Sequence, residues 1–273
     1  IDNRQSEAVA IAQHADAVIL CVGLDATLEG EQSDTGNHFA SGDKPDLELP
    51  AAQRRLVDAV LKAGKPVITV LATGSAMRVE EGNAILWTGY PGQAGGRALA
   101  DILFGKVSPS GKLPVTFYKS DKDLPEFTDY SMDNRTYRYY TGEALYPFGY
   151  GLSYTSFNLA DIVYNHTGVE AKITNVGPMD GEEVIQVYVK NDHLAAPENP
   201  VLCAFMRVAL KAGESKKVTL PLDDLAFTVV DDKGMRHKVS GPKTLYVGTS
   251  QPDSRSETLT GIPCTQLQLS GDD

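Results

Sequence analysis

Four carboxylates lie within fourteen residues in the stretch "GLDATLEGEQSDTG", residues 23–36. They are Asp25, Glu29, Glu31 and Asp34, and they follow an apolar run, "ADAVILCVG", that indicates a buried strand. Ligands of open α/β sheets bind beyond the carboxyl ends of the strands, which is where this stretch falls. A glutamate there can act as a general acid if burial or a neighbouring carboxylate raises its pKa towards neutrality. The alternative at this point is a solvated acidic loop, which is common on protein surfaces.

Other motifs with a chemical meaning are weaker. The five histidines are scattered without metal-ligand spacing and the three cysteines are far apart, so we predict no metal site and no cofactor. His38 alone lies beside the acidic stretch and is a candidate for ligand contact. The glycine-rich "YPGQAGG" reads G-x-x-G-G rather than G-x-G-x-x-G, which leaves a flavodoxin-like nucleotide binder as a minor hypothesis.

The first part of the chain, residues 1–120, alternates helix and strand patterns. A strand, a helix and a second strand at this spacing predict right-handed crossovers and a parallel sheet covered by helices on both faces. The fold class expected here is therefore α/β, a three-layer sandwich. The helices are indicated by "SEAVAIAQHA", "PAAQRRLVDAVLKAG" and "GQAGGRALADILFG", and the strands by "AVILCVG", "KPVITVLAT" and "NAILWTGY".

The rest of the chain has a different pattern. Residues 157–273 contain short alternating strands separated by turn residues, such as "VEAKITNVG" and "EVIQVYVKN", which predict an antiparallel β-sandwich of immunoglobulin or fibronectin III type. Residues 121–156 form a connector rich in tyrosine, glycine and proline. We expect this connector to be packed, because so many aromatic side chains would not remain solvated.

The bulk composition limits the partners. The formal net charge of −11 and the pI near 4.9 argue against nucleic acid, whose backbone needs a surplus of Lys and Arg. No apolar run reaches the roughly 18 residues that a bilayer requires, so we expect no membrane span. The first residues show neither an initiator methionine nor a signal-peptide pattern, and we expect the chain to be a piece of a longer protein or a processed product.

Several separated motifs together resemble one family. In order along the chain they are "GLDATLEGEQSDTG", "LELPAAQRRLVDAV", "GKPVITVL", "ILWTGYPGQAGGRALADILFGKVSPSGKLPVTFY" and "RTYRYYTGEALYPFGYGLSYTSF". This series resembles the C-terminal part of family 3 glycoside hydrolases of the β-xylosidase and β-glucosidase type. The second half, with "TNVGPMDGEEVIQVYV", is similar to the fibronectin type III-like domain that ends many members.

The resemblance implies a reaction and a missing partner. Family members remove a β-linked sugar from a non-reducing end with retention, using an Asp nucleophile on an N-terminal (β/α)8 barrel and a Glu acid/base on the following α/β sandwich. No segment here matches the barrel. The resemblance therefore implies a barrel domain upstream or in a partner chain, little hydrolysis by the isolated chain, and a periplasmic or secreted location. A non-catalytic carbohydrate-binding or interaction protein made of these two domains alone is the alternative.

The family's acid/base can be carried over to two neighbouring residues. Xylosidase-like members show Glu-x-Glu-x-x-Asp followed by Arg, and Glu29, Glu31 and Asp34 keep that spacing. Thr35 stands where the Arg would be, so Asp43 is an alternative counterpart of the aspartate. The resemblance places Glu31 first as acid/base and Glu29 second. The other carboxylate would hold its neighbour protonated or bind sugar hydroxyls.

The substrate follows from the resemblance more loosely. "LWTGYPGQAGG" and "RTYRYYTG" are more similar to β-xylosidase and α-L-arabinofuranosidase members, which implies a β-linked xylo- or gluco-oligosaccharide and a role in xylan degradation. Besides Asp34 and His38, the candidate substrate contacts are Trp87 and Tyr90, as sugar-stacking or domain-docking aromatics. For Trp87, packing in the core is an equally good interpretation.

Overall fold

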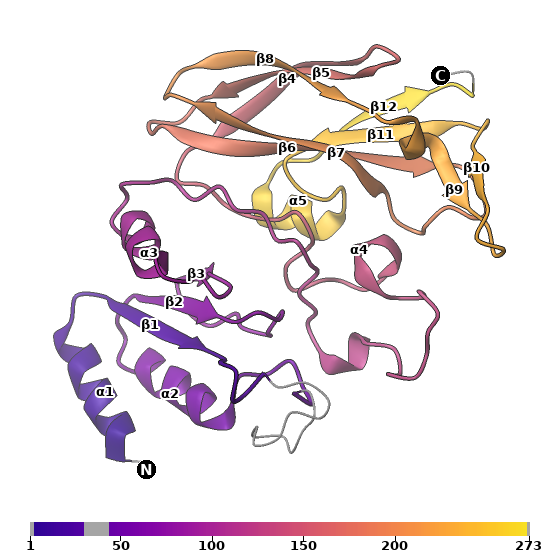
Figure 1. Ribbon diagram of the computed structural model, residues 1–273. Coiled ribbons are helices and arrows are strands. Elements are labelled where there is room, and N and C mark those ends of the chain that lie inside the picture. Colours follow the sequence, from indigo (N-terminus) through magenta and orange to yellow (C-terminus); the bar gives the residue numbers. More distant parts are fainter. Residues whose placement is uncertain (1–2, 30–43, 272–273) are drawn as a thin grey trace. The chain divides into compact units, whose positions relative to one another are not determined.

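The computed structural model describes residues 3–29 and 44–271 (Figure 1). The chain divides into two compact units, one of Ile1–Ala100 with Tyr118–Asp121, the other of Asp101–Phe117 with Lys122–Asp273. The contacts therefore group residues 101–117 with the second unit. The domain limits expected from the sequence, 1–120 and 157–273 with a connector between them, remain a prediction. Among the described residues, no helix is both long and apolar enough to cross a bilayer.

The first unit is built on a three-stranded parallel sheet in the order β1-β2-β3. Its strands are β1 (Val18–Gly23), β2 (Val67–Ala72) and β3 (Ala84–Trp87). The central strand, "VITVLA", is apolar except for Thr69 and is mostly buried, because a parallel sheet is covered on both faces. The α/β class predicted for this part of the chain is confirmed.

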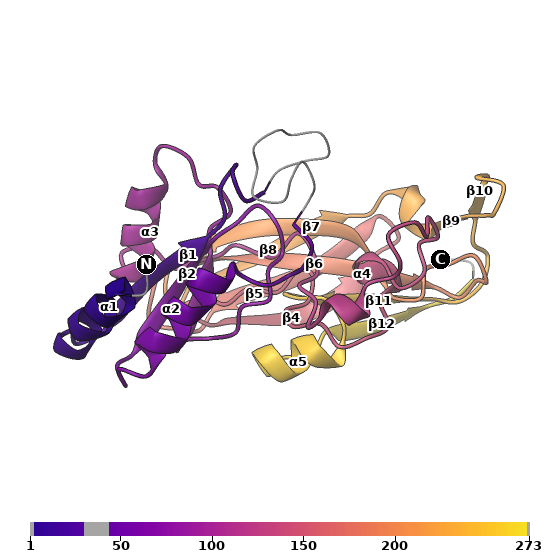
Figure 2. The same cartoon turned by 90° about the horizontal axis from the view of Figure 1, so that it is seen from below.

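Helices lie on both faces of this sheet. The helices α1 (Asn3–His14) and α2 (Ala51–Leu61) lie on one face, and α3 (Gly95–Leu103) starts on the other (Figures 1 and 2). The α2 helix buries Val57 and Val60, three positions apart, because residues at that spacing share one side of a helix. The resulting three layers expose the carboxyl ends of the strands at one edge.

The end of β1 is fixed by a glycine and a glutamine. A Cβ on Gly23 would lie 2.0 Å from the carbonyl oxygen of Ala72, so only glycine permits this approach to β2. The Gly23 N–H donates to Oε1 of Gln53 at 2.8 Å, and Nε2 of Gln53 donates to the Gly23 carbonyl at 2.7 Å. The α2 helix therefore holds the point at which the acidic stretch begins.

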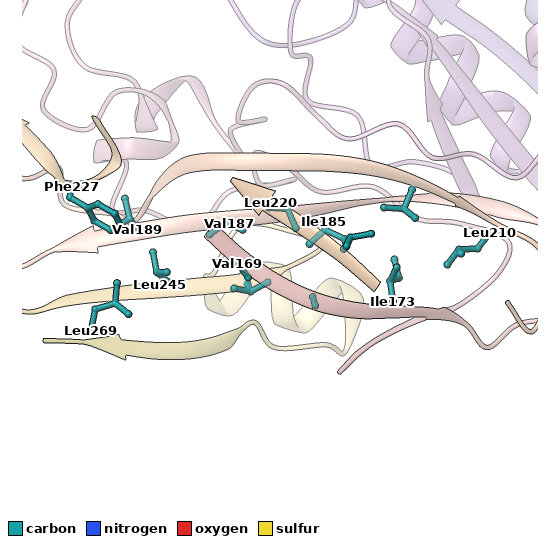
Figure 3. Packing of buried hydrophobic residues seen from close by; sticks show 14 residues of the cluster. Val169, Ile173, Ile185, Val187, Val189, Leu210, Leu220, Phe227, Leu245 and Leu269 are labelled. Atoms are coloured by element: carbon teal, nitrogen blue, oxygen red, sulfur yellow. The ribbon is translucent and has the colours of Figure 1, made fainter. Parts of the chain in front are cut away.

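The second unit contains a β-sandwich of two antiparallel sheets, as predicted for the C-terminal part of the chain. One sheet has the order β12-β11-β6-β7 and the other β4-β5-β8, and β9 and β10 form a separate hairpin. Aliphatic side chains from both sheets, including Ile173, Ile185 and Leu245, are fully buried between them (Figure 3). The strands are β4 (Phe157–Tyr164), β5 (Gly168–Asn175), β6 (Gly181–Asn191), β7 (Val201–Leu210), β8 (Ser215–Pro221), β9 (Thr228–Val230), β10 (Arg236–Lys238), β11 (Lys243–Gly248) and β12 (Thr265–Leu269). The short helices are η1 (Asp121–Asp123), α4 (Thr136–Tyr139), η2 (Asp224–Phe227) and α5 (Ser254–Thr260).

The connector packs against the sandwich over its later half. The ring of Tyr137 stacks on Phe148 at a centroid distance of 4.1 Å and meets Tyr188 of β6 edge-on at 6.3 Å. The earlier half behaves differently, because Phe127 and Tyr130 are 86% and 92% exposed. The expectation of a packed connector therefore holds for Tyr137 and Phe148 and fails for Phe127 and Tyr130.

Candidate active site

The candidate site lies at the carboxyl ends of the three strands of the first unit. Glu29 follows β1, Gly74 and Ser75 follow β2, and Tyr90 follows β3. Parallel strands bring their carboxyl ends to one edge, and ligands of open α/β sheets bind there. Each strand of the sheet thus contributes at least one residue to the same place.

The carboxylate of Glu29 joins these residues. Its Oε1 accepts the Ser75 N–H at 3.0 Å and the Ser75 hydroxyl. Its Oε2 accepts the Gly74 N–H at 3.3 Å and the Tyr90 hydroxyl. The Glu29 side chain, which follows β1, is therefore hydrogen-bonded to residues that follow β2 and to the residue that follows β3.

The protonation of this cluster follows from its hydrogen bonds. Burial acts to raise the pKa of Glu29, but the hydrogen bonds from Ser75, Tyr90 and Gly74 outweigh it, so the pKa lies below its ordinary value near 4.5. Desolvation and the hydrogen bond to Glu29 raise the pKa of Tyr90 to about 12. At neutral pH the carboxylate is therefore ionised and the phenol is protonated, and the phenol donates to the carboxylate.

The absence of a side chain at Gly74 allows Glu29 and Tyr90 to approach the turn after β2. A Cβ at Gly74 would lie 2.9 Å from Cε2 of Tyr90 and 3.3 Å from Oε2 of Glu29. The first distance is too short for a carbon contact, so a larger residue would push the tyrosine ring away. The missing side chain lets the Tyr90 ring lie directly against the turn after β2.

Trp87 supports the same turn from the end of β3. Its indole N–H donates to the carbonyl of Thr73 at 3.0 Å and lies 3.2 Å from the Thr73 hydroxyl oxygen. That hydroxyl donates to the Ser75 carbonyl at 2.7 Å. Trp87 is only partly buried, so it combines a structural hydrogen bond with a ring that retains some exposure.

The structure brings together Glu29, Trp87 and Tyr90 among the residues chosen from the sequence. Glu31, Asp34 and His38 lie outside the described residues, as does Asp43. Sequence reasoning missed Gly74 and Ser75, although their position directly after the strand "KPVITVLAT" was a usable signal. Within the part of the chain that the structure describes, no group of three or more His, Cys, Asp or Glu side chains could hold a metal ion.

The fold and the site define a class of protein: an α/β sandwich with a hydrogen-bonded carboxylate, Glu29, at its strand ends, followed by a fibronectin-like β-sandwich. Residues 2–154 match the model described as "Glycosyl hydrolase family 3 C-terminal domain", and residues 183–251 match the "Fibronectin type III-like domain". The first match covers more than half of the 273 residues, and the chain belongs to glycosyl hydrolase family 3. The resemblance seen in the sequence is thereby confirmed.

Individual relatives agree with this assignment. The chain is 41% identical over 272 residues to a xylan 1,4-beta-xylosidase of Xylanibacter ruminicola, covering 93% of this chain and 31% of the relative. It is 38% identical to an exo-alpha-(1->6)-L-arabinopyranosidase of Bifidobacterium breve, covering 94% of this chain and 36% of the relative. The solved structure of the beta-glucosidase D2-BGL of Chaetomella raphigera aligns with a TM-score of 0.85 and 30% identity, over 97% of this chain and 41% of that one. The chain thus spans about a third of the length of these curated relatives.

Proposed function

We propose that this chain is the C-terminal portion of a retaining, exo-acting β-glycosidase and that Glu31 is its general acid/base. Family membership and the position of the acidic stretch beyond β1 support this function. The observation that favours Glu31 over Glu29 is the hydrogen-bonding state of Glu29. A general acid must hold a proton near neutral pH, whereas four donors keep Glu29 ionised.

In this proposal the chain supplies half of a two-carboxylate mechanism. Protonated Glu31 gives its proton to the glycosidic oxygen while a nucleophilic carboxylate attacks the anomeric carbon and the aglycone leaves. Glu31, now ionised, takes a proton from water, whose oxygen displaces the enzyme carboxylate and releases the sugar with retained configuration. The nucleophile belongs to the (β/α)8 barrel, and the two carboxyl groups must approach to about 5–5.5 Å.

The proposed substrate is a β-linked xylo-oligosaccharide, with gluco-oligosaccharides second. The xylan 1,4-beta-xylosidase at 41% identity favours xylose. Tyr90 is 55% exposed while its hydroxyl is held by Glu29, so its ring is presented in a fixed orientation suited to stacking on a sugar. Trp87, Asp34 and His38 complete the proposed substrate contacts.

Aryl β-xyloside hydrolysis tests the proposed function. We expect no turnover by the isolated chain, because it lacks the nucleophile, and turnover by the full-length protein that contains the barrel. In that protein Glu31→Ala should lower kcat/KM by about 10²–10⁴-fold, the usual contribution of general acid/base catalysis. Azide should restore turnover of Glu31→Ala and give a xylosyl azide of retained configuration.

Three results would contradict the proposal. Turnover by the isolated chain at a normal glycosidase rate would show that no barrel nucleophile is needed. Azide rescue of Glu29→Ala, but not of Glu31→Ala, would show that Glu29 and not Glu31 is the acid/base. Binding of xylobiose by the isolated chain, with no hydrolysis when the barrel is present, would favour a non-catalytic carbohydrate-binding protein instead.

A further inference from the structure

The Glu29 carboxylate has no hydrogen-bonding capacity left for a substrate. An ionised carboxylate offers about four lone-pair sites. Four donors fill them: two backbone N–H groups, from Gly74 and Ser75, and two hydroxyls, from Ser75 and Tyr90. A group in this state is poorly suited both to carrying a proton and to binding a sugar hydroxyl.

The backbone between β1 and Glu29 is itself well defined. The N–H groups of Leu28 and Glu29 both donate to the carbonyl of Asp25, at 2.9 and 2.8 Å. The Asp25 side chain accepts the Thr27 N–H at 2.9 Å and also the Thr27 hydroxyl. Together with the Gln53 contacts at the strand end, these bonds form one short turn that starts at the sheet.

We propose that Glu29 is a positioning residue, whose carboxylate ties the turn after β1 to the residues that follow β2 and β3. This inference rests on the proposed function, because what Glu29 positions is the backbone two residues before the acid/base Glu31. The sheet is the rigid frame. Because Glu29 is bonded to the residues that follow β2 and β3, its hydrogen bonds hold the chain that leaves β1 in a fixed position relative to those two strands. Tyr90 contributes both to the tether and to the proposed substrate contacts, because the hydrogen bond from its hydroxyl to Glu29 also orients its exposed ring.

Accurate placement matters for the proposed reaction. A proton donor misplaced by about 1 Å can lose about 10²-fold in rate, because proton transfer requires hydrogen-bond distance to the leaving oxygen. Removal of the tether should therefore slow the reaction without removing the acid. In the full-length protein we expect Glu29→Gln to lower kcat/KM by about 10- to 100-fold and to leave the pH profile with the same two limbs.

A measurement that does not depend on catalysis tests the tether itself. Hydrogen exchange of the Gly74 and Ser75 amides, followed by NMR in the present chain, should accelerate about tenfold in Glu29→Gln, the effect of losing a hydrogen bond to a charged group. The matched control is Glu7→Gln, which removes the same charge from an exposed position on α1 and should leave both amides unchanged. Ser75→Ala and Tyr90→Phe each remove one donor and should act in the same direction but less strongly, which keeps the test available if Glu29→Gln does not fold.

The outcomes separate the tether from the proposed function. Unchanged exchange of both amides in Glu29→Gln, Ser75→Ala and Tyr90→Phe would overturn the positioning role. Azide rescue of Glu29→Ala to the level of Glu31→Ala would also overturn it, because Glu29 would then be the acid/base. Faster exchange in a full-length protein without glycosidase activity would support the tether and refute the proposed function alone.

Discussion

A buried ion pair provides a direct test of how the segment 101–117 folds. Nζ of Lys112 lies 2.8 Å from Oε1 of Glu183 on β6, and the two side chains are only 11% and 10% exposed. The same ammonium donates to the carbonyl of Gly151 at 2.9 Å. Lys112→Met keeps most of the apolar stem but leaves the Glu183 carboxylate buried without its cation.

The expected cost can be worked from this geometry. Removing one partner of a buried pair costs about 3–5 kcal/mol, because the remaining charge is uncompensated. Glu183 keeps the Val184 N–H as a donor at 2.7 Å and is not fully enclosed, so we expect about 3 kcal/mol for Lys112→Met. The double variant with Glu183→Gln removes both charges and should be less destabilised than Lys112→Met alone, by about 1–2 kcal/mol.

Urea unfolding with two optical probes can locate the loss. Trp87 is the only tryptophan and belongs to the first unit, whereas most of the twelve tyrosines belong to the second. Lys112→Met should lower the midpoint of the tyrosine near-UV circular dichroism transition more than that of Trp87 fluorescence. The control is Lys106→Met. Nζ of Lys106 lies 3.3 Å from Oδ1 of Asp101 and the lysine side chain is 72% exposed, so loss of this ion pair should cost at most about 1 kcal/mol of stability. Equal effects of the two lysine variants, or a loss seen by Trp87 alone, would refute the reasoning.

Two further predictions concern the first unit. Gly23→Ala should strongly destabilise it or prevent its folding, because the new Cβ would lie 2.0 Å from the Ala72 carbonyl oxygen. Gly96→Ala in α3 meets nothing within 4 Å and should stabilise by about 0.5–1 kcal/mol, so equal unfolding midpoints of the two variants would contradict the close approach. Because folding lowers the pKa of Glu29, the ionised carboxylate stabilises the folded state. This contribution is fully present above the ordinary glutamate pKa of 4.5 and is lost as the pH falls through the lower pKa of the folded state. The midpoint difference between wild type and Glu29→Gln, followed by Trp87 fluorescence, should therefore shrink on acidification, and a difference that grows would reverse the assigned sign.

The assignment of roles to Glu29 and Glu31 changes how the acidic stretch is understood. In the sequence the two residues are nearly equivalent, since both follow the same strand and they are only two positions apart in the acidic stretch. Of the two, the structure describes Glu29, and its carboxylate accepts hydrogen bonds from the hydroxyls of Ser75 and Tyr90. Under the two proposals, Glu29 positions the turn after β1 and Glu31 is the proton donor.

The sequence by itself determined the two architectures and the place of the acidic stretch. Apolar runs such as "VITVLA" identify strands covered on both faces, and alternating runs identify the later sandwich, because burial pattern depends on local periodicity. Only the tertiary structure decided which residues meet at the strand ends. Gly74 lies 45 residues and Tyr90 61 residues from Glu29, so their hydrogen bonds depend on the register and crossover of three strands, and no local pattern encodes that. The grouping of residues 101–117 with the second unit has the same origin, since the Lys112–Glu183 pair spans two segments that periodicity treats separately.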